Sequence, residues 1–71
     1  MTAMRQVLIY QDESGGWCAE CPSLPGCNSQ GEDREDAIRN IKEAIELYVE
    51  SLQLDGQPIP PDTLSAVLVV V

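Results

Sequence analysis

One stretch of the chain has apolar residues at the spacing of an α-helix, and this stretch limits which folds are available. The apolar residues between positions 37 and 52 recur every three or four positions, so they form one stripe along a helix. They are Ala37, Ile38, Ile41, Ala44, Ile45, Tyr48, Val49 and Leu52. Asp33 is suited to cap the start of this helix, with Asp36 reaching back to it, and Gly56 is suited to end it. The 71 residues have room for one core, so we expect a single domain over residues 1–71.

The remaining segments are short, β-branched and bounded by turn residues, which is typical of strands. Three of them precede the helix, at residues 4–11, 17–21 and 27–30. A glycine-containing turn at residues 12–16 separates the first two, and prolines break the chain at residues 22–26. The run at residues 65–71 is too short and too β-branched for a helix, and it favours a fourth strand.

These elements predict an α+β domain with the order β-β-β-α-β. We expect an antiparallel meander of three strands, a crossover helix, and a last strand that joins the sheet parallel to a neighbour. One helix covers only one face of a sheet, whereas the first and last strands are apolar on both faces. We therefore expect a homo-oligomer, either a dimer or a larger assembly. The residues expected at its interface are Val67, Leu68, Val69, Val70 and Val71.

The charge balance limits the partners of this domain. Twelve acidic residues and four basic residues give a formal net charge of −8. Phosphate contacts need clustered Lys and Arg, so this composition argues against direct binding of nucleic acid. It favours a basic protein partner, or it serves solubility alone. Glu43, Glu46 and Glu50 lie on the helix side opposite the apolar stripe, which is either a solvated face or a docking surface.

Membrane association and secretion are not expected. No apolar stretch approaches the roughly 20 residues that a membrane span needs. The first five residues lack the charged and then apolar pattern of a signal peptide. These features predict a cytoplasmic protein, in which thiols stay reduced.

The cysteines and the acidic residues are the candidates for chemistry. Cys18 and Cys21 have the spacing of metal-binding pairs, but on a strand they point to opposite faces, and the chain has no histidine. Small buried thiols are the favoured interpretation. A magnesium-dependent nuclease would need a carboxylate cluster, whereas most of the candidates fall in a turn or at a helix start, where acids are favoured anyway. Those candidates are Asp12, Glu13, Glu20, Glu32 and Asp33. We therefore predict no catalytic residue, metal or cofactor.

Three segments in combination resemble the HicB-like antitoxin family. Residues 15–31 are similar to that family's glycine–aromatic start and its Pro-x-Leu-Pro-Gly-Cys-x-Ser-Gln-Gly motif. Residues 37–48 are similar to its Ala-x-x-Asn-x-x-Glu-Ala-Ile helix, and residues 56–60 match its usual exit. The resemblance covers about residues 7–62 in register, and the combination is specific to the family.

The resemblance implies a partial ribonuclease-H-like sheet with one helix and no catalytic activity. It also implies an antitoxin that binds and blocks a HicA-type toxin, which is a small basic ribonuclease that cleaves mRNA. The chain differs from longer family members in having no C-terminal DNA-binding domain after the last expected strand, so we do not expect it to bind operator DNA on its own. The alternative is a stand-alone oligomeric HicB-like binding protein without a cognate toxin, and a minimal nuclease is the third hypothesis.

Overall fold

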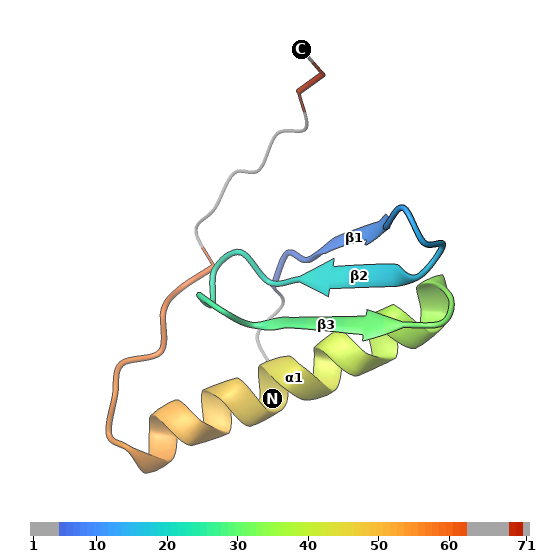
Figure 1. The fold of residues 1–71 in the computed structure, drawn as a ribbon. Helices are drawn as coiled ribbons and strands as arrows, with labels where there is room; N and C mark the ends of the chain where they lie inside the picture. The colour runs from blue at the N-terminus through green and yellow to red at the C-terminus, as the bar shows by residue number, and fades with distance from the viewer. Residues whose placement is uncertain (1–4, 63–68, 71) are drawn as a thin grey trace.

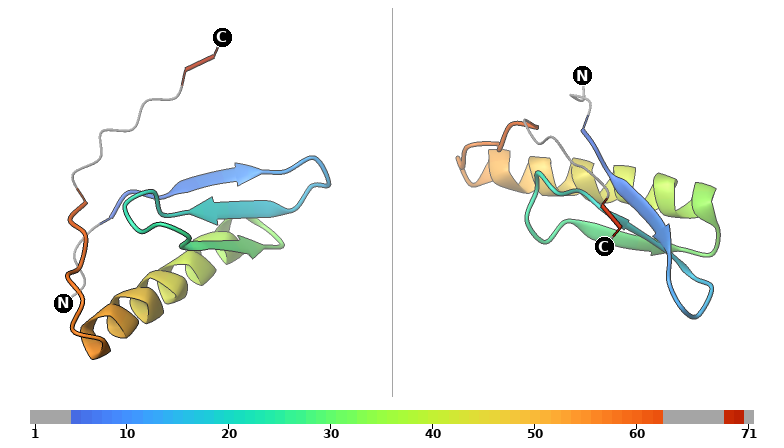
Figure 2. Two further views of the ribbon diagram at one scale, coloured as in Figure 1. Left: turned by 60° about the vertical axis from the view of Figure 1, so that its left-hand side comes forward. Right: turned by 90° about the horizontal axis from the view of Figure 1, so that it is seen from above.

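The fold is a small antiparallel sheet followed by one long helix. The computed structural model describes residues 5–62 and 69–70. Its elements in chain order are β1 (Leu8–Gln11), β2 (Trp17–Glu20), β3 (Asn28–Gly31) and α1 (Arg34–Leu54). The helix lies along one face of the sheet, as Figures 1 and 2 show from three sides. The expected meander of three antiparallel strands followed by a helix is confirmed.

The register of the sheet decides which side chains face the helix. The strand order is β1-β2-β3, and Ala19 at the middle of β2 lies opposite Ile9 of β1 and Ser29 of β3. Ala19 is fully buried against α1. Because successive side chains alternate between faces, Tyr10 and its neighbour Cys18 lie on the other face of the sheet.

Both ends of α1 carry the caps that the sequence predicts, with one difference. The Asp33 carboxylate accepts the N–H of Asp36 at 2.7 Å. The Asp36 carboxylate reaches back to the N–H of Glu32 at 3.0 Å, not to that of Asp33, so the reciprocal bond falls one residue earlier than expected. Gly56 adopts a φ of +67° after the last turn, and the N–H groups of Gly56 and Gln57 donate to carbonyls of that turn. The helix therefore begins and ends where the sequence indicates.

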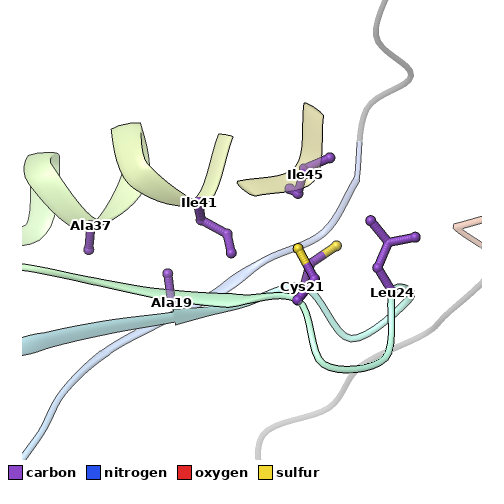
Figure 3. Packing of buried hydrophobic residues seen from close by; sticks show 7 residues of the cluster. Ala19, Cys21, Leu24, Ala37, Ile41 and Ile45 are labelled. Atoms are coloured by element: carbon purple, nitrogen blue, oxygen red, sulfur yellow. The ribbon is translucent and has the colours of Figure 1, made fainter. Parts of the chain in front are cut away.

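The core lies between α1 and the helix-facing side of the sheet. Its buried members are Ala19, Cys21, Leu24, Cys27, Ala37, Ile41 and Ile45. In Figure 3, Ala37 and Ile41 point from the helix toward Ala19 and the end of β2. All eight residues of the predicted apolar stripe are buried or half-buried, which confirms the predicted inner face of the helix. Leu24, in the proline-containing connection, is fully buried although it belongs to no element.

The connection after the helix returns to the beginning of β1. The Arg5 guanidinium donates to the Pro60 carbonyl at 2.8 Å and to the Ser23 hydroxyl at 2.9 Å. The Asp62 carboxylate accepts the N–H of Gln6 at 2.9 Å. These bonds join residues 58–62 to the start of the chain, so the connection crosses from the far end of α1 back to the sheet (Figure 1).

Three expectations about the sheet are not confirmed. The fourth strand expected at residues 65–71 lies mostly outside the described residues, and the two that are described, Val69 and Val70, are exposed and in no strand. The sheet of the described residues has three strands. β1 is also shorter than expected, since it begins at Leu8. The likeness to a ribonuclease-H-like sheet is not confirmed either.

Candidate protein-binding site

The outer face of α1 has the largest concentration of like charge that the helix presents. Glu43, Glu46 and Glu50 are all exposed and lie opposite the buried Ile41 and Ile45, because their spacings of three and four residues keep them on one side of the helix. None of the three carboxylates has an ion-pair or hydrogen-bond partner among residues 5–62 and 69–70. Their negative charge is therefore available to a partner.

Two large apolar side chains lie on the same outer face. Leu47 is 65% exposed and Leu54 is 80% exposed. The spacing of seven residues between them corresponds to two helical turns, so they are aligned along the helix. We call the five residues Glu43, Glu46, Leu47, Glu50 and Leu54 the acidic–leucine face. A surface of this composition offers both charge attraction and apolar area to a partner protein.

The basic residues near this face offset its charge only in part. Lys42 is exposed beside Glu43 and one turn before Glu46, and it forms no ion pair among the described residues. Arg39 forms an ion pair with Asp36, one turn toward the start of the helix, and Arg34 pairs with the adjacent Glu35 at 3.1 Å. The last turn of α1 contains no basic residue. The negative end of the helix dipole therefore adds to the charge of Glu50 in the final turns of the helix.

A second exposed apolar area lies on the uncovered face of the sheet. Leu8 is 43% exposed and Tyr10 is 45% exposed. The Tyr10 hydroxyl donates to the Glu20 carboxylate at 3.2 Å, and the negative charge of Glu20 raises the pKa of Tyr10 above its ordinary value of 10.0. Of the interface residues expected from the sequence, Val69 and Val70 are 67% and 93% exposed, and the other three lie outside the described ranges.

Three of the five acidic residues considered for a nuclease, Asp12, Glu20 and Asp33, make local structural contacts. The Asp12 carboxylate accepts the hydroxyl of Ser14 and the N–H groups of Ser14 and Gly16, all within 2.9 Å. These bonds hold the pKa of the Asp12 carboxyl below its ordinary value of 3.8, and the bond from the Ser14 hydroxyl has the largest effect. Asp33 caps α1. Among the described residues, no three acidic or cysteine side chains gather in a group that could hold a metal ion.

The structure places Cys18 and Cys21 on opposite faces of the sheet, as the strand geometry predicts. Cys18 is half-buried on the outer face, with its sulfur 3.8 Å from the Asp12 carboxylate. Cys21 lies just beyond the end of β2, with 2% of its surface exposed, and its sulfur is 3.5 Å from the Ser23 hydroxyl. The two thiols do not share one site.

Two hydrogen bonds anchor α1 to its neighbours, and that of Tyr48 was not predicted from the sequence. The Tyr48 hydroxyl donates to the Pro25 carbonyl at 2.9 Å and thereby fixes the proline-containing connection to α1. The Asn40 amide donates to the Gln30 carbonyl of edge strand β3 at 2.7 Å. The sequence signal for the Tyr48 contact is the Leu-Pro-Gly stretch at residues 24–26, which indicates a turn but not its attachment to α1.

The fold and its charged helix face define a small α+β domain with a surface suited to binding protein. The chain is matched over residues 6–69 by the family described as HicB-like antitoxins of bacterial toxin–antitoxin systems. It therefore belongs to the HicB-like antitoxin family, as the motif resemblance indicated.

Named relatives agree with this membership. The UPF0150 protein ssr1765 of Synechocystis sp. is 53% identical over 58 residues, which cover 82% of this chain and 73% of the relative. The UPF0150 protein Ta0767 of Thermoplasma acidophilum is 43% identical over 63 residues, or 89% of this chain and 91% of that protein. No solved structure is significantly similar to the chain. Among the described residues, no helix has the length and apolar character needed to cross a membrane.

Proposed function

We propose that this protein is the antitoxin partner of a small, basic, mRNA-cleaving toxin of the HicA type, and that it blocks the toxin by binding it. The observation that supports this function best is the acidic–leucine face of α1. Its three carboxylates, which have no partner among the described residues, project from a helix with an apolar and packed inner face. These carboxylates take no part in the core, so they are available to recognise a partner.

Binding is the whole of the proposed mechanism, and no chemical step is assigned to this chain. The net charge of −8 attracts a basic toxin over long range and speeds encounter. At contact, Leu47 and Leu54 exclude water, and this strengthens the charge pairs around them. The bound domain would cover the surface that the toxin uses for RNA. The site of this action would be the cytoplasm, where mRNA is translated.

Self-association is a second part of the proposal. The uncovered sheet face exposes Leu8 and Tyr10, and the C-terminal valines that are described are exposed as well. A single domain of this size buries only about 60% of the surface of its unfolded chain, so an additional apolar contact contributes substantially to stability. We infer that Val67, Leu68, Val69, Val70 and Val71 take part in a contact between copies of the chain.

The test of the proposed function is co-expression with a HicA-type toxin encoded beside the gene for this chain. The wild-type chain should relieve the growth arrest, co-purify with the toxin and stop RNA cleavage at an equimolar ratio. The double variant Leu47→Ser/Leu54→Ser should weaken this protection, because it removes the apolar part of the proposed contact. Ile59→Ser removes an apolar side chain that is 38% exposed and lies outside both proposed contacts, and it should protect as the wild type does.

Two outcomes would contradict the proposal. The first is a chain that folds but neither binds the toxin nor relieves growth arrest, which would favour a stand-alone HicB-like protein. The second is magnesium-dependent cleavage of RNA or DNA by the purified chain that is lost in Asp12→Ala or Glu20→Ala. That result would favour the nuclease hypothesis.

A further inference from the structure

Cys21 and Cys27 face each other across the base of the connection between β2 and β3. The ladder of these two strands pairs Ala19 with Ser29 and Glu20 with Asn28, so the next pair in the same register is Cys21 with Cys27. The N–H of Cys21 donates to the carbonyl of Cys27 at 2.9 Å, which continues the ladder by one step. Directly opposite residues point to the same face of a sheet. Both thiols accordingly lie in the core, 2% and 6% exposed.

The backbone already holds this connection in a closed form. The N–H of Leu24 donates to the Cys21 carbonyl at 3.1 Å, and the N–H of Cys27 donates to the Leu24 carbonyl at 3.0 Å. Two consecutive turns therefore bring the chain back on itself. Cys21 and Cys27 share one of the two bonds of a hydrogen-bonded pair, and opposed residues in antiparallel strands have Cα atoms about 4.5–5.5 Å apart. That separation falls within the range of about 4.4–6.8 Å in which disulfides form.

The two thiols influence each other, and a partly open cavity lies beside the connection that joins the two cysteines. Burial raises the pKa of the Cys27 thiol, the neighbouring Cys21 raises it further, and Arg5 opposes both effects. A partly open cavity of about 190 Å³ is lined by Cys21, Cys27 and residues of the connection between them. A water molecule occupies about 30 Å³ in the liquid. The cavity therefore has room for an oxidant the size of hydrogen peroxide.

We propose that Cys21 and Cys27 are a redox modification site, at which a hydroperoxide converts the two thiols into a reversible intramolecular disulfide. A thiolate, which burial makes the minor form at Cys27, attacks an oxygen of hydrogen peroxide. The O–O bond breaks, the cysteine becomes a sulfenic acid and hydroxide leaves. The second thiol then attacks the sulfenic sulfur and water leaves. The two thiols lose two electrons in total, and these reduce the peroxide. Thiol reductants reverse the reaction through exchange.

The disulfide would fix the connection that Tyr48 anchors to α1. It would close a loop of seven residues from Cys21 to Cys27. A loop of that length removes conformational freedom from the unfolded chain. In a domain of this size the midpoint of thermal unfolding, Tm, should rise by about 10 °C on oxidation. This inference concerns the core of the domain and does not rest on the proposed toxin binding.

The experiment is peptide mapping of the folded full chain after treatment with hydrogen peroxide. A glutamate-specific protease cuts after Glu20 and after Glu32, so it releases Cys21 and Cys27 together on peptide 21–32 and leaves Cys18 on another peptide. After peroxide, peptide 21–32 should be two hydrogen atoms lighter and resist alkylation, while Cys18 stays alkylatable. Dithiothreitol should restore the original mass. The helical circular dichroism should be the same before and after oxidation.

Single variants provide the controls. Cys18→Ser should form the same disulfide, because Cys18 lies on the other face of the sheet. Cys21→Ser and Cys27→Ser should form no intramolecular bond. The proposal is overturned if peptide 21–32 of the wild type keeps two alkylatable thiols at every peroxide concentration. A Cys21–Cys27 bond that appears only together with loss of helical signal would overturn it as well, because the folded backbone would then not accommodate the bond.

Discussion

Gly31, the last residue of β3, shows how strongly one position constrains this fold. A Cβ atom at Gly31 would lie 2.3 Å from the backbone nitrogen of Ala37 and 2.8 Å from its Cα. Backbone atoms of the helix cannot move aside without displacing α1 from the sheet. Gly31→Ala should therefore lower the free energy of unfolding by about 3 kcal/mol, a cost typical of overpacking. Asn28→Ala, at an exposed position of the same strand, is the control and should change it little. Urea denaturation measures both, and equal stability of the two variants would contradict the packing described.

Asp12 makes the hairpin between β1 and β2 sensitive to acid. Its pKa is lower in the folded chain than its ordinary value, so its contribution to stability is present above the unfolded pKa and is lost as the pH falls through the folded pKa. Asp12→Asn retains an acceptor oxygen but cannot carry the charge. The wild type should be the more stable of the two at about pH 6, and the difference should narrow below about pH 4. Thermal unfolding across this pH range measures it, and a difference that stays constant would show that the carboxylate charge has no part in the turn.

Tyr48 tests how much one hydrogen bond contributes to holding the connection between β2 and β3. Tyr48→Phe removes the hydroxyl that donates to the Pro25 carbonyl and leaves the ring in place. We expect the free energy of unfolding to fall by about 1 kcal/mol, the usual net value of such a bond. Tyr10→Phe removes a longer and exposed bond to Glu20 and serves as the comparison. If Tyr10→Phe cost as much as Tyr48→Phe, the anchoring role of Tyr48 would be refuted.

At the scale of elements, the helix was predictable because its signals are local. The apolar period, the Asp33 cap and the Gly56 stop all lie within or next to the helix, so they act whatever the rest of the chain does. The strands were predictable in order but not in length. β1 begins at Leu8 because Leu8, which pairs with Glu20, is the first residue paired with β2. The length of β1 therefore depends on its partner strand.

The proline-containing connection was not predictable in its main feature. The sequence shows prolines and a glycine, which indicate a break, and this is correct for the backbone. The two successive turns are closed by local hydrogen bonds, but the burial of Leu24 depends on packing against α1 and on the bond of Tyr48 to Pro25, which join residues far apart in the chain. For the same reason the opposition of Cys21 and Cys27 appears only once the register of β2 and β3 is known.

At the scale of the whole molecule, the net charge was evident from composition but its location was not. Asp33, Asp36 and Asp12 are held in caps and turns, whereas Glu43, Glu46 and Glu50 have no partner among the described residues. Hydrogen bonds and ion pairs thus separate structural acids from available ones. The helix face was predictable from the sequence, whereas the difference between acids held in caps and turns and acids without a described partner is visible only in the structure.

The proposed self-association of the chain can be tested at its C-terminal valines. Val69→Asp or Val70→Asp should dissociate the proposed oligomer or unfold the chain, since full burial of one valine contributes roughly 1.5–3 kcal/mol and a buried charge opposes it. Ile59→Asp adds the same charge at an exposed position outside the C-terminal run and should leave the assembly intact. Light scattering at micromolar concentration measures the mass. A monomeric wild type, with unchanged stability in both valine variants, would contradict the interface.

The most direct test of the central claim is the binding of the purified HicA-type toxin to two variants of equal net charge. Glu43→Gln/Glu46→Gln/Glu50→Gln removes three charges from the acidic–leucine face, and Glu13→Gln/Glu32→Gln/Glu35→Gln removes three exposed charges elsewhere. The first should bind at least about tenfold more weakly than the wild type, which corresponds to about 1.4 kcal/mol. The second should show only a modestly slower association, which salt screens in the same way as for the wild type. Equal affinity of the two variants would contradict the account, because net charge and not the helix face would then govern recognition.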